Sequence, residues 1–210
     1  MKLYIARHAE TTWNLAGRYQ GRRESALSAR GVQQGMALAA ALAAATPPPT
    51  RIITSPMQRT RATAAFAAER LNVPLENDDA LIEIAHGTWE GRLRDEIAAN
   101  DAARYSTWRE RPAEVAFEEG ESLRDVAARW KRFRAFLRLD APTLLVTHDA
   151  IVRAALLDIA ARPLSDFWSV RVENAAYAVV EGEGETWTLL EESVNAHLTG
   201  TRAATESQAL

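Results

Sequence analysis

Arg7 and His8 stand next to each other near the start of the chain, directly after the apolar run at residues 3–6. A strand that ends in this pair would present a guanidinium and an imidazole at the edge of a sheet, which is where open α/β folds bind ligands. The planar fork of arginine matches a phosphate, and neutral histidine is a nitrogen nucleophile. The pair alone is common on protein surfaces, so its meaning depends on what the chain places beside it.

Two further segments carry polar groups where an apolar run ends. Arg59 follows the run at residues 51–54 after a short turn, and His148 and Asp149 follow the run at residues 143–147. Because parallel strands end at one edge of a sheet, these groups are expected to converge with Arg7 and His8. Two arginines, two histidines and nearby helix N-termini would form an anion site. Its charge suits a phosphate dianion, whose phosphorus one imidazole could attack.

The elements that must position these residues alternate along the chain. Short β-rich runs are each followed by a turn and an alanine-rich helical pattern, which predicts an α/β fold with a mostly parallel sheet covered on both faces, a three-layer α/β/α sandwich. The expected strands are residues 2–6, 51–54 and 143–147, with a hairpin at 175–181 and 186–192, and the expected helices are residues 28–45, 57–71, 122–137 and 149–161.

One segment breaks the alternation. Residues 86–121 carry Trp89, Tyr105, Trp108 and Phe117 among many charges and no clean strand, which predicts a short helical lid inserted over the sheet. No internal repeat or linker divides the chain, so residues 1–198 are expected to form a single domain. Residues 199–210 are small and polar and are expected to be a flexible tail.

The composition of the 210 residues limits the classes of function. The net charge of −3 argues against nucleic acid and anionic membranes as partners, and the absence of cysteine excludes disulfides and thiolate chemistry. No apolar stretch reaches the roughly 18–20 residues of a membrane span. No signal-peptide pattern precedes the first strand, so a cytoplasmic protein is expected.

Several short motifs, in this order, resemble those of the histidine phosphatase superfamily, the phosphoglycerate mutase-like proteins, and within it the small phosphatases. They are Arg7-His8-Ala9-Glu10-Thr11, Ser55-Pro56-Met57-Gln58-Arg59, Leu81-Ile82-Glu83 with Gly87-Thr88-Trp89-Glu90-Gly91, Gly120-Glu121-Ser122-Leu123, Thr147-His148, and Asn195-Ala196-His197-Leu198. Any one of them is unspecific, whereas the ordered set over residues 1–198 is highly specific.

The resemblance implies a role for each motif. His8 would be the nucleophile that becomes phosphohistidine, while Arg7, Arg59 and His148 would bind the phosphoryl oxygens and Asn14 would add a hydrogen bond. Glu83 would protonate the leaving oxygen and then help to activate water. No metal ion and no cofactor are implied, because fixed cations supply the charge that a magnesium ion would otherwise contribute.

The chain departs from the family pattern at two places. Ala9 stands where the family usually has glycine, so the backbone there must accept a Cβ atom. Asp149-Ala150 stands where the small phosphatases usually have Gly-Gly, and a His-Asp pair is typical of the acid phosphatase branch, in which the aspartate is the proton donor. The chain therefore has two candidate acids. The other motifs favour Glu83, in which case Asp149 would cap the helix that follows it.

Other polar residues are expected to be structural. Arg61 and Arg153 fit solvated positions on helices, and Glu10, Gln20 and Glu90 fit structural positions, with the alternative that Gln20 lines the pocket. His86 and His197 fit structural or surface positions.

The expected activity is hydrolysis of a small phosphorylated metabolite. A mutase would need a fuller insertion to hold two phosphorylated ligands and exclude water, and the stretch between Gly91 and Gly120 is short. Mutase-type phosphoryl transfer and a non-catalytic phospholigand-binding protein remain as alternatives. The sequence does not identify the phosphomonoester, and it leaves the oligomeric state open, with a homodimer among the options.

Overall fold

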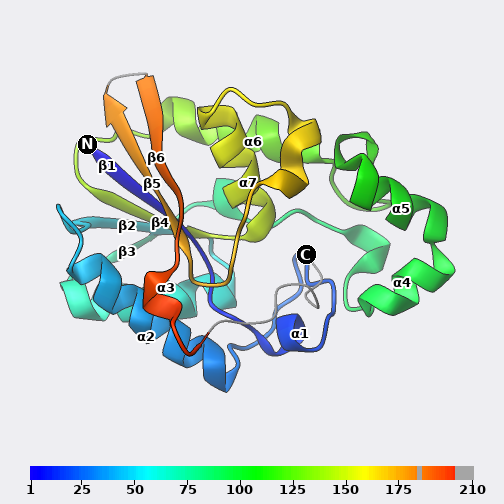
Figure 1. Cartoon of the computed structure of the whole chain (residues 1–210), viewed down its shortest axis with the longest axis horizontal. Coiled ribbons are helices and arrows are strands. Elements are labelled where there is room, and N and C mark those ends of the chain that lie inside the picture. The colour runs from blue at the N-terminus through cyan, green and yellow to red at the C-terminus, as the bar shows by residue number, and fades with distance from the viewer. Residues whose placement is uncertain (184–185, 202–210) are drawn as a thin grey trace.

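The computed structural model describes residues 1–183 and 186–201, and Figure 1 shows a central sheet with helices on both faces. Within these residues six strands form one sheet. The strands are β1 (Lys2–Arg7), β2 (Arg51–Thr54), β3 (Leu75–Asn77), β4 (Thr143–Thr147), β5 (Tyr177–Glu183) and β6 (Thr186–Val194). The α/β/α architecture predicted from the alternating pattern is confirmed.

The sheet is mixed, in the order β3-β2-β4-β1-β5-β6. The four strands from β3 to β1 are mutually parallel, while β5 is antiparallel to β1, and β6 to β5. The predicted hairpin is therefore the antiparallel edge of the same sheet, and its turn at residues 184–185 lies outside the described residues. The short edge strand β3 was not predicted.

Alternation along the inner strands fills both faces of the sheet. In β1, Leu3 and Ile5 belong to one apolar cluster, and Tyr4 and Ala6 belong to the other. In β4, Leu145 belongs to the first cluster, and Leu144 and Val146 belong to the second. Strands buried on both sides read as continuous apolar runs, which explains why these segments were recognisable in the sequence.

Helices cover the two faces in separate layers (Figure 1). One face carries α2 (Ala29–Ala43) and α3 (Gln58–Leu71), and the other carries α6 (Leu123–Phe136) and α7 (Asp149–Ile159). Ser28 caps α2 by accepting a hydrogen bond from the Gly31 amide, and Ser122 with Asp125 forms a capping box at α6. The other short elements outside the insertion are α1 (Thr12–Leu15), η1 (Asp79–Leu81), η4 (Leu164–Ser169) and η5 (Ala196–Leu198).

The insertion at residues 86–121 is helical, as predicted. Its elements are η2 (Gly87–Trp89), α4 (Arg94–Asn100), α5 (Ala102–Glu110) and η3 (Pro112–Glu114). Trp89 and Trp108 are fully buried, and both lie edge-on to Phe117 with ring centroids 5.0 Å apart. In Figure 1, α4 and α5 lie at the right of the molecule, on the side toward which β1 runs.

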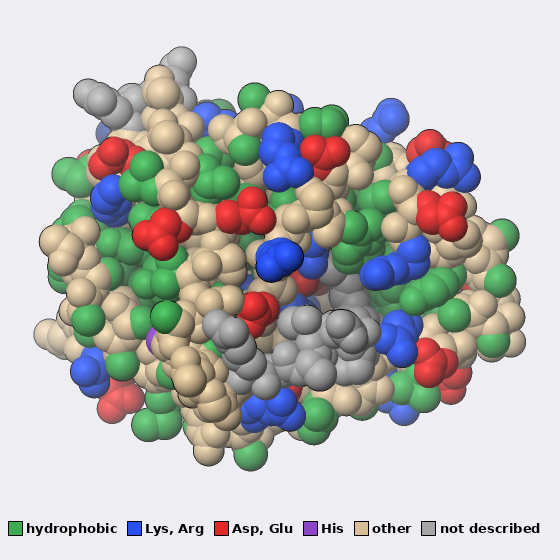
Figure 2. Space-filling model, viewed as in Figure 1, with side chains coloured by type: hydrophobic (Ala, Val, Ile, Leu, Met, Phe, Trp, Pro, Cys, Tyr) green, Lys and Arg blue, Asp and Glu red, His purple; other side chains and the backbone are tan. Residues whose placement is uncertain are grey.

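Figure 2 shows Lys and Arg side chains lying among Asp and Glu side chains on the face that it presents. Two predictions remain, about the tail and about membrane-spanning helices. The expected flexible tail falls largely on residues 202–210, which lie outside the described residues. No helix within residues 1–183 and 186–201 combines the length and hydropathy that a membrane crossing would require.

Candidate active site

The strand register brings the three sequence segments to one edge of the sheet. Arg7 of β1 lies opposite Thr147 of β4, and Thr54 of β2 lies opposite Val146. The residues that follow these strand ends include His8 and His148, whose ring centroids are 5.3 Å apart. The parallel arrangement therefore places the two imidazoles beside one another, as expected.

His8 is held as a neutral ring with one nitrogen free to react. Its Nδ1 lies 2.8 Å from the Ala9 carbonyl oxygen. Because a carbonyl only accepts hydrogen bonds, Nδ1 carries the proton and Nε2 keeps its lone pair. Burial, reinforced by Arg59 and Arg7, holds the pKa of His8 well below its ordinary range. The ring is thus unprotonated near neutral pH, which is the state a nitrogen nucleophile requires.

Two buried guanidiniums lie beside His8. Both terminal nitrogens of Arg59 donate to carbonyl oxygens, of Arg23 at 2.9 Å and of Gly21 at 2.8 Å. Arg7 donates from Nη1 to the Val172 carbonyl at 3.1 Å. In both arginines Nε is buried and has no hydrogen-bond partner among the described residues. A buried donor without a partner is costly, so each Nε–H is available to an anion.

His148 offers a third buried donor position. Its Nε2 lies 2.8 Å from the Ser55 hydroxyl, and its Nδ1 has no partner among residues 1–183 and 186–201. If the Ser55 hydroxyl donates to Nε2, the imidazole proton sits on Nδ1, the atom left free. Burial, followed by Arg59, holds the pKa of His148 well below its ordinary range, so the ring is neutral.

Glu83 has the electrostatic environment of a proton donor. Its carboxyl is 4% exposed and accepts hydrogen bonds from the Ile84 amide at 2.9 Å and the Ala150 amide at 3.3 Å. Burial raises the pKa of Glu83 to about 7, while Arg59 acts in the opposite direction. About half of the carboxyl groups carry a proton at neutral pH when the pKa lies there.

Asp149, the alternative acid, is engaged on both oxygens. The prediction that it caps α7 is wrong, because His148 holds the N-cap position and no side-chain hydrogen bond caps this helix. Its Oδ2 lies 3.0 Å from Arg7 Nη1, and its Oδ1 contacts Arg153 Nε. Both oxygens of Asp149 are therefore occupied by ion pairs with guanidiniums. The prediction that Arg153 is a solvated helix residue is wrong, because this side chain is 9% exposed and also donates to the carbonyls of Phe167 and Val170. Asp149, which also contacts Arg153 on the same helix, therefore holds the Arg7 guanidinium in place.

The loop after β1 is fixed by its own polar side chains. Asn14 Oδ1 accepts from the Thr11 amide at 3.1 Å and contacts its hydroxyl, so Asn14 shapes this loop at the start of α1. Glu10 accepts from the Ser28 hydroxyl at 2.7 Å, and Gln20 accepts from the Ser25 hydroxyl at 2.7 Å. These contacts agree with the structural positions expected of Glu10 and Gln20.

The unusual Ala9 causes no backbone strain. It is not among the residues with positive φ, and its amide donates to the Thr63 hydroxyl at 3.0 Å. Its methyl group is fully buried in the cluster that α2 and α3 cover. The Cβ atom that replaces glycine is therefore accommodated as ordinary core.

Asn174 and His86 lie outside the set of residues predicted to form the site. Asn174 was not predicted, and its side chain donates to the His8 carbonyl at 3.1 Å; no sequence signal marks it, because it lies in an irregular segment before β5. His86 is fully buried against Tyr19 and Phe117, and burial lowers its pKa to about 3, so it is a core residue as expected.

Comparison with known proteins assigns the chain to a class. The model of the histidine phosphatase superfamily (branch 1) matches residues 3–195. The chain belongs to this superfamily, as the ordered motifs predict.

Two of the similar proteins are named as phosphatases of small metabolites. The chain is 36% identical to phosphoserine phosphatase 1 of Hydrogenobacter thermophilus, with 94% of each chain covered. It is 29% identical to the adenosylcobalamin/alpha-ribazole phosphatase of Salmonella typhimurium, covering 86% of this chain and 90% of that one. The structure of Bacillus stearothermophilus YhfR superposes with a TM-score of 0.87 at 30% identity, covering 94% of this chain and 98% of that one.

Proposed function

We propose that this protein is a metal-independent phosphomonoesterase that hydrolyses a small phosphorylated metabolite through a phosphohistidine on His8. One observation carries the proposal: three buried nitrogens, Arg7 Nε, Arg59 Nε and His148 Nδ1, lack partners among the described residues, and their side chains lie beside a neutral imidazole. Three donors from separate strand ends match the three equatorial oxygens of a phosphoryl group in transfer.

The charge of the site fits the same ligand. Arg7, Arg59 and Arg153 bring three guanidiniums to the site, and Asp149 pairs with Arg7 and Arg153, while His8 is neutral, as is Glu83 when it is protonated. The buried guanidiniums beside His8 suit a phosphate dianion. Fixed guanidiniums in a water-poor site stabilise transferring phosphate without a metal ion.

The first step forms the phosphoenzyme. The Nε2 lone pair of His8 attacks phosphorus while the bond from phosphorus to the ester oxygen breaks, and Glu83 gives its proton to the departing oxygen. The Ala9 carbonyl, 2.8 Å from Nδ1, stabilises the positive charge that the imidazole gains. The alcohol leaves, and Glu83 is now ionised.

The second step restores the enzyme. The Glu83 carboxylate removes a proton from water, whose oxygen attacks phosphorus as the nitrogen–phosphorus bond breaks. Inorganic phosphate is released, His8 regains its neutral form and Glu83 is again protonated. A carboxyl with a pKa of about 7 is suited to both directions of transfer.

Two further residues complete the proposed site. Asp149, placed between Arg7 and Arg153, fixes the orientation of Arg7 and is not the acid. Asn14, whose Oδ1 is used by Thr11, supports the loop that follows the nucleophile and adds a hydrogen bond to the phosphoryl group.

The substrate class is a small cytoplasmic phosphomonoester. Two relatives are named for phosphoserine and alpha-ribazole phosphate, both of which are alkyl phosphates. The short insertion, with α4 and α5 as its only α-helices within the described residues, favours hydrolysis over transfer between two phosphorylated ligands. The cytoplasm is inferred because such metabolites are found there.

A panel of phosphomonoesters assayed with a chelator present tests the proposal. We expect phosphate release from p-nitrophenyl phosphate and, faster, from one alkyl ester such as phosphoserine. Interconversion of phosphoglycerates that depends on a bisphosphoglycerate primer would identify a mutase instead. Tight phosphate binding without turnover of any ester would identify a non-catalytic binding protein.

A further inference from the structure

The segment that carries Glu83 has no regular structure of its own. It follows η1, and residues 82–86 form neither helix nor strand. The backbone amides and carbonyls of such a segment need partners supplied from elsewhere. The position of the Glu83 carboxyl therefore depends on the side chains that bind residues 80–85.

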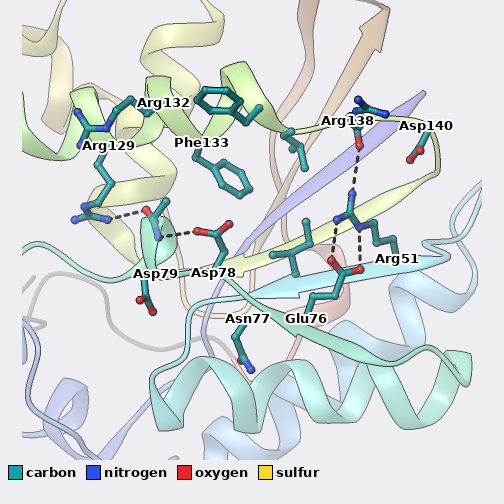
Figure 3. Close-up of a pocket in the computed structure, with 14 residues that line it drawn as sticks. Arg51, Glu76, Asn77, Asp78, Asp79, Arg129, Arg132, Phe133, Arg138 and Asp140 are labelled. Atoms are coloured by element: carbon teal, nitrogen blue, oxygen red, sulfur yellow. Dashed lines mark hydrogen bonds and ion pairs between the residues drawn. The ribbon is translucent and has the colours of Figure 1, made fainter.

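Arg129 of α6 binds this segment on its amino-terminal side. One terminal nitrogen, Nη1, donates to the carbonyls of Ala80 and Ile82, each at 2.7 Å. Figure 3 shows Arg129 reaching from its helix toward the segment that follows Asp79, along the wall of an open groove of about 800 Å³. The two carbonyls lie just before Glu83, so Arg129 fixes the chain where it approaches the acid.

Glu121 binds the same segment on its carboxyl-terminal side. Its Oε2 accepts a hydrogen bond from the Ala85 amide at 3.1 Å, and its own amide donates to the Ala85 carbonyl at 2.9 Å. Arg129 Nη2 lies 3.1 Å from the same Oε2. Arg129 and Glu121 are thus joined by an ion pair, and together they bind the segment at residues 80–85 on both sides of Glu83.

Arg22 connects this ion pair to the phosphate side of the site. Its Nη2 lies 2.9 Å from Glu121 Oε1, and its Nε lies 3.5 Å from the Glu83 carbonyl. Arg22 sits between Gly21 and Arg23, whose carbonyls hold Arg59. The turn that orients a phosphate-binding guanidinium therefore also contacts the acid segment.

We propose that Arg129 and Glu121 are positioning residues for general acid catalysis: they hold the Glu83 carboxyl at the leaving oxygen without touching substrate. This inference rests on the proposed role of Glu83. Ordinary structural support would also produce these contacts, but it predicts a different kinetic signature. A displaced acid slows esters whose leaving group needs a proton and spares p-nitrophenolate, which departs readily without one.

The test is Arg129→Lys, measured on phosphoserine and on p-nitrophenyl phosphate. Lysine keeps the charge but lacks the planar fork that serves two carbonyls and a carboxylate together. We expect kcat to fall about tenfold or more on phosphoserine and less than about twofold on p-nitrophenyl phosphate, because misplaced groups lose much of their catalytic effect. Glu121→Gln provides a second variant with the same expected pattern.

Arg132→Lys is the matched control, since Arg132 lies on the same helix and lines the same groove but is exposed. It should leave both rates unchanged. In the background of Glu83→Gln, adding Arg129→Lys should produce no further loss specific to phosphoserine. Thermal unfolding of each variant identifies any that fail to fold, and Glu121→Gln then carries the test.

Two failures are distinguishable. If Glu83→Gln itself slows both esters equally, the acid assignment is wrong and the positioning inference falls with it. If Glu83→Gln is selective for phosphoserine but Arg129→Lys and Glu121→Gln slow both esters equally, or add their full loss to Glu83→Gln, only the positioning inference is overturned.

Discussion

Replacing Glu83 with glutamine removes the proton while keeping the shape of the side chain. The carboxyl is buried, and its pKa is raised from 4.5 to about 7. In the free enzyme it is therefore about nine-tenths protonated at pH 6 and about one-tenth protonated at pH 8. The catalytic competence of Glu83 as an acid should follow this titration.

The assay is kcat/KM against pH for phosphoserine and p-nitrophenyl phosphate, since this parameter reports pKa values of the free enzyme. For phosphoserine we expect a loss of about 10²-fold or more in Glu83→Gln at pH 6, the scale of general acid catalysis. The alkaline decline near pH 7 should be present in the wild type and absent in the variant. For p-nitrophenyl phosphate the loss should be far smaller.

The raised pKa of Glu83 also predicts how the stability of the protein depends on pH. The native state binds this proton more tightly than the unfolded chain, so the stabilisation is fully present below pH 4.5 and is lost as pH rises to about 7. A shift from 4.5 to about 7 corresponds to about 3 kcal/mol. Between pH 4.5 and 8, Glu83→Gln should therefore gain about 3 kcal/mol in unfolding free energy relative to the wild type, measured by urea denaturation.

Asp149→Asn is the matched control, because it removes a buried carboxylate from the same site. Loss of the contact with Arg7 should raise KM for both esters by a similar factor, with little dependence on the leaving group. If Asp149→Asn selectively slows phosphoserine while Glu83→Gln does not, the acid is Asp149 and the reasoning from burial and ion pairing is refuted.

Two further predictions concern metal and backbone. Activity should survive EDTA, because Arg7 and Arg59 supply the positive charge; restoration of a chelated, inactive enzyme by a divalent ion would contradict this. Gly87→Ala should lower the unfolding free energy by about 3 kcal/mol, because φ is +53° and a Cβ would lie 1.8 Å from the Glu118 carbonyl oxygen. Gly200→Ala, with φ of +85° in open space, should cost only about 1 kcal/mol by the same denaturation measurement, and equal losses would count against the steric argument.

The sequence predicts the fold best where physical signals are local and strong. The buried strands β1 and β4 contain the apolar runs at residues 3–6 and 144–146, β2 contains Ile52 and Ile53, and Pro47 follows the predicted end of α2. The strand β3 has only three residues and two of them are exposed, so it leaves no apolar run to recognise. The place of β5 beside β1 depends on long-range pairing that periodicity does not contain.

The residues of the candidate site could also be predicted only in part from the sequence. Parallel strand ends predict that Arg7, His8 and His148 converge, and the structure brings them together. Arg153 was misjudged because helical spacing does not reveal that η4 covers that face of α7. The sequence motifs already favour Glu83 over Asp149 as the acid, and the three-dimensional contacts support that preference, because Glu83 is buried with a raised pKa while both oxygens of Asp149 are ion-paired.

The most direct test of the central claim is to trap the phosphoenzyme. After rapid quenching with a phosphorus-labelled substrate, the wild type should carry label that is stable in base, labile in acid and located on His8 by peptide mapping. His8→Ala should fold normally, carry no label and retain less than about a hundredth of the rate, because loss of covalent catalysis costs several kcal/mol of barrier. Label on a carboxyl or hydroxyl side chain, or a His8→Ala enzyme above that rate, would contradict the account.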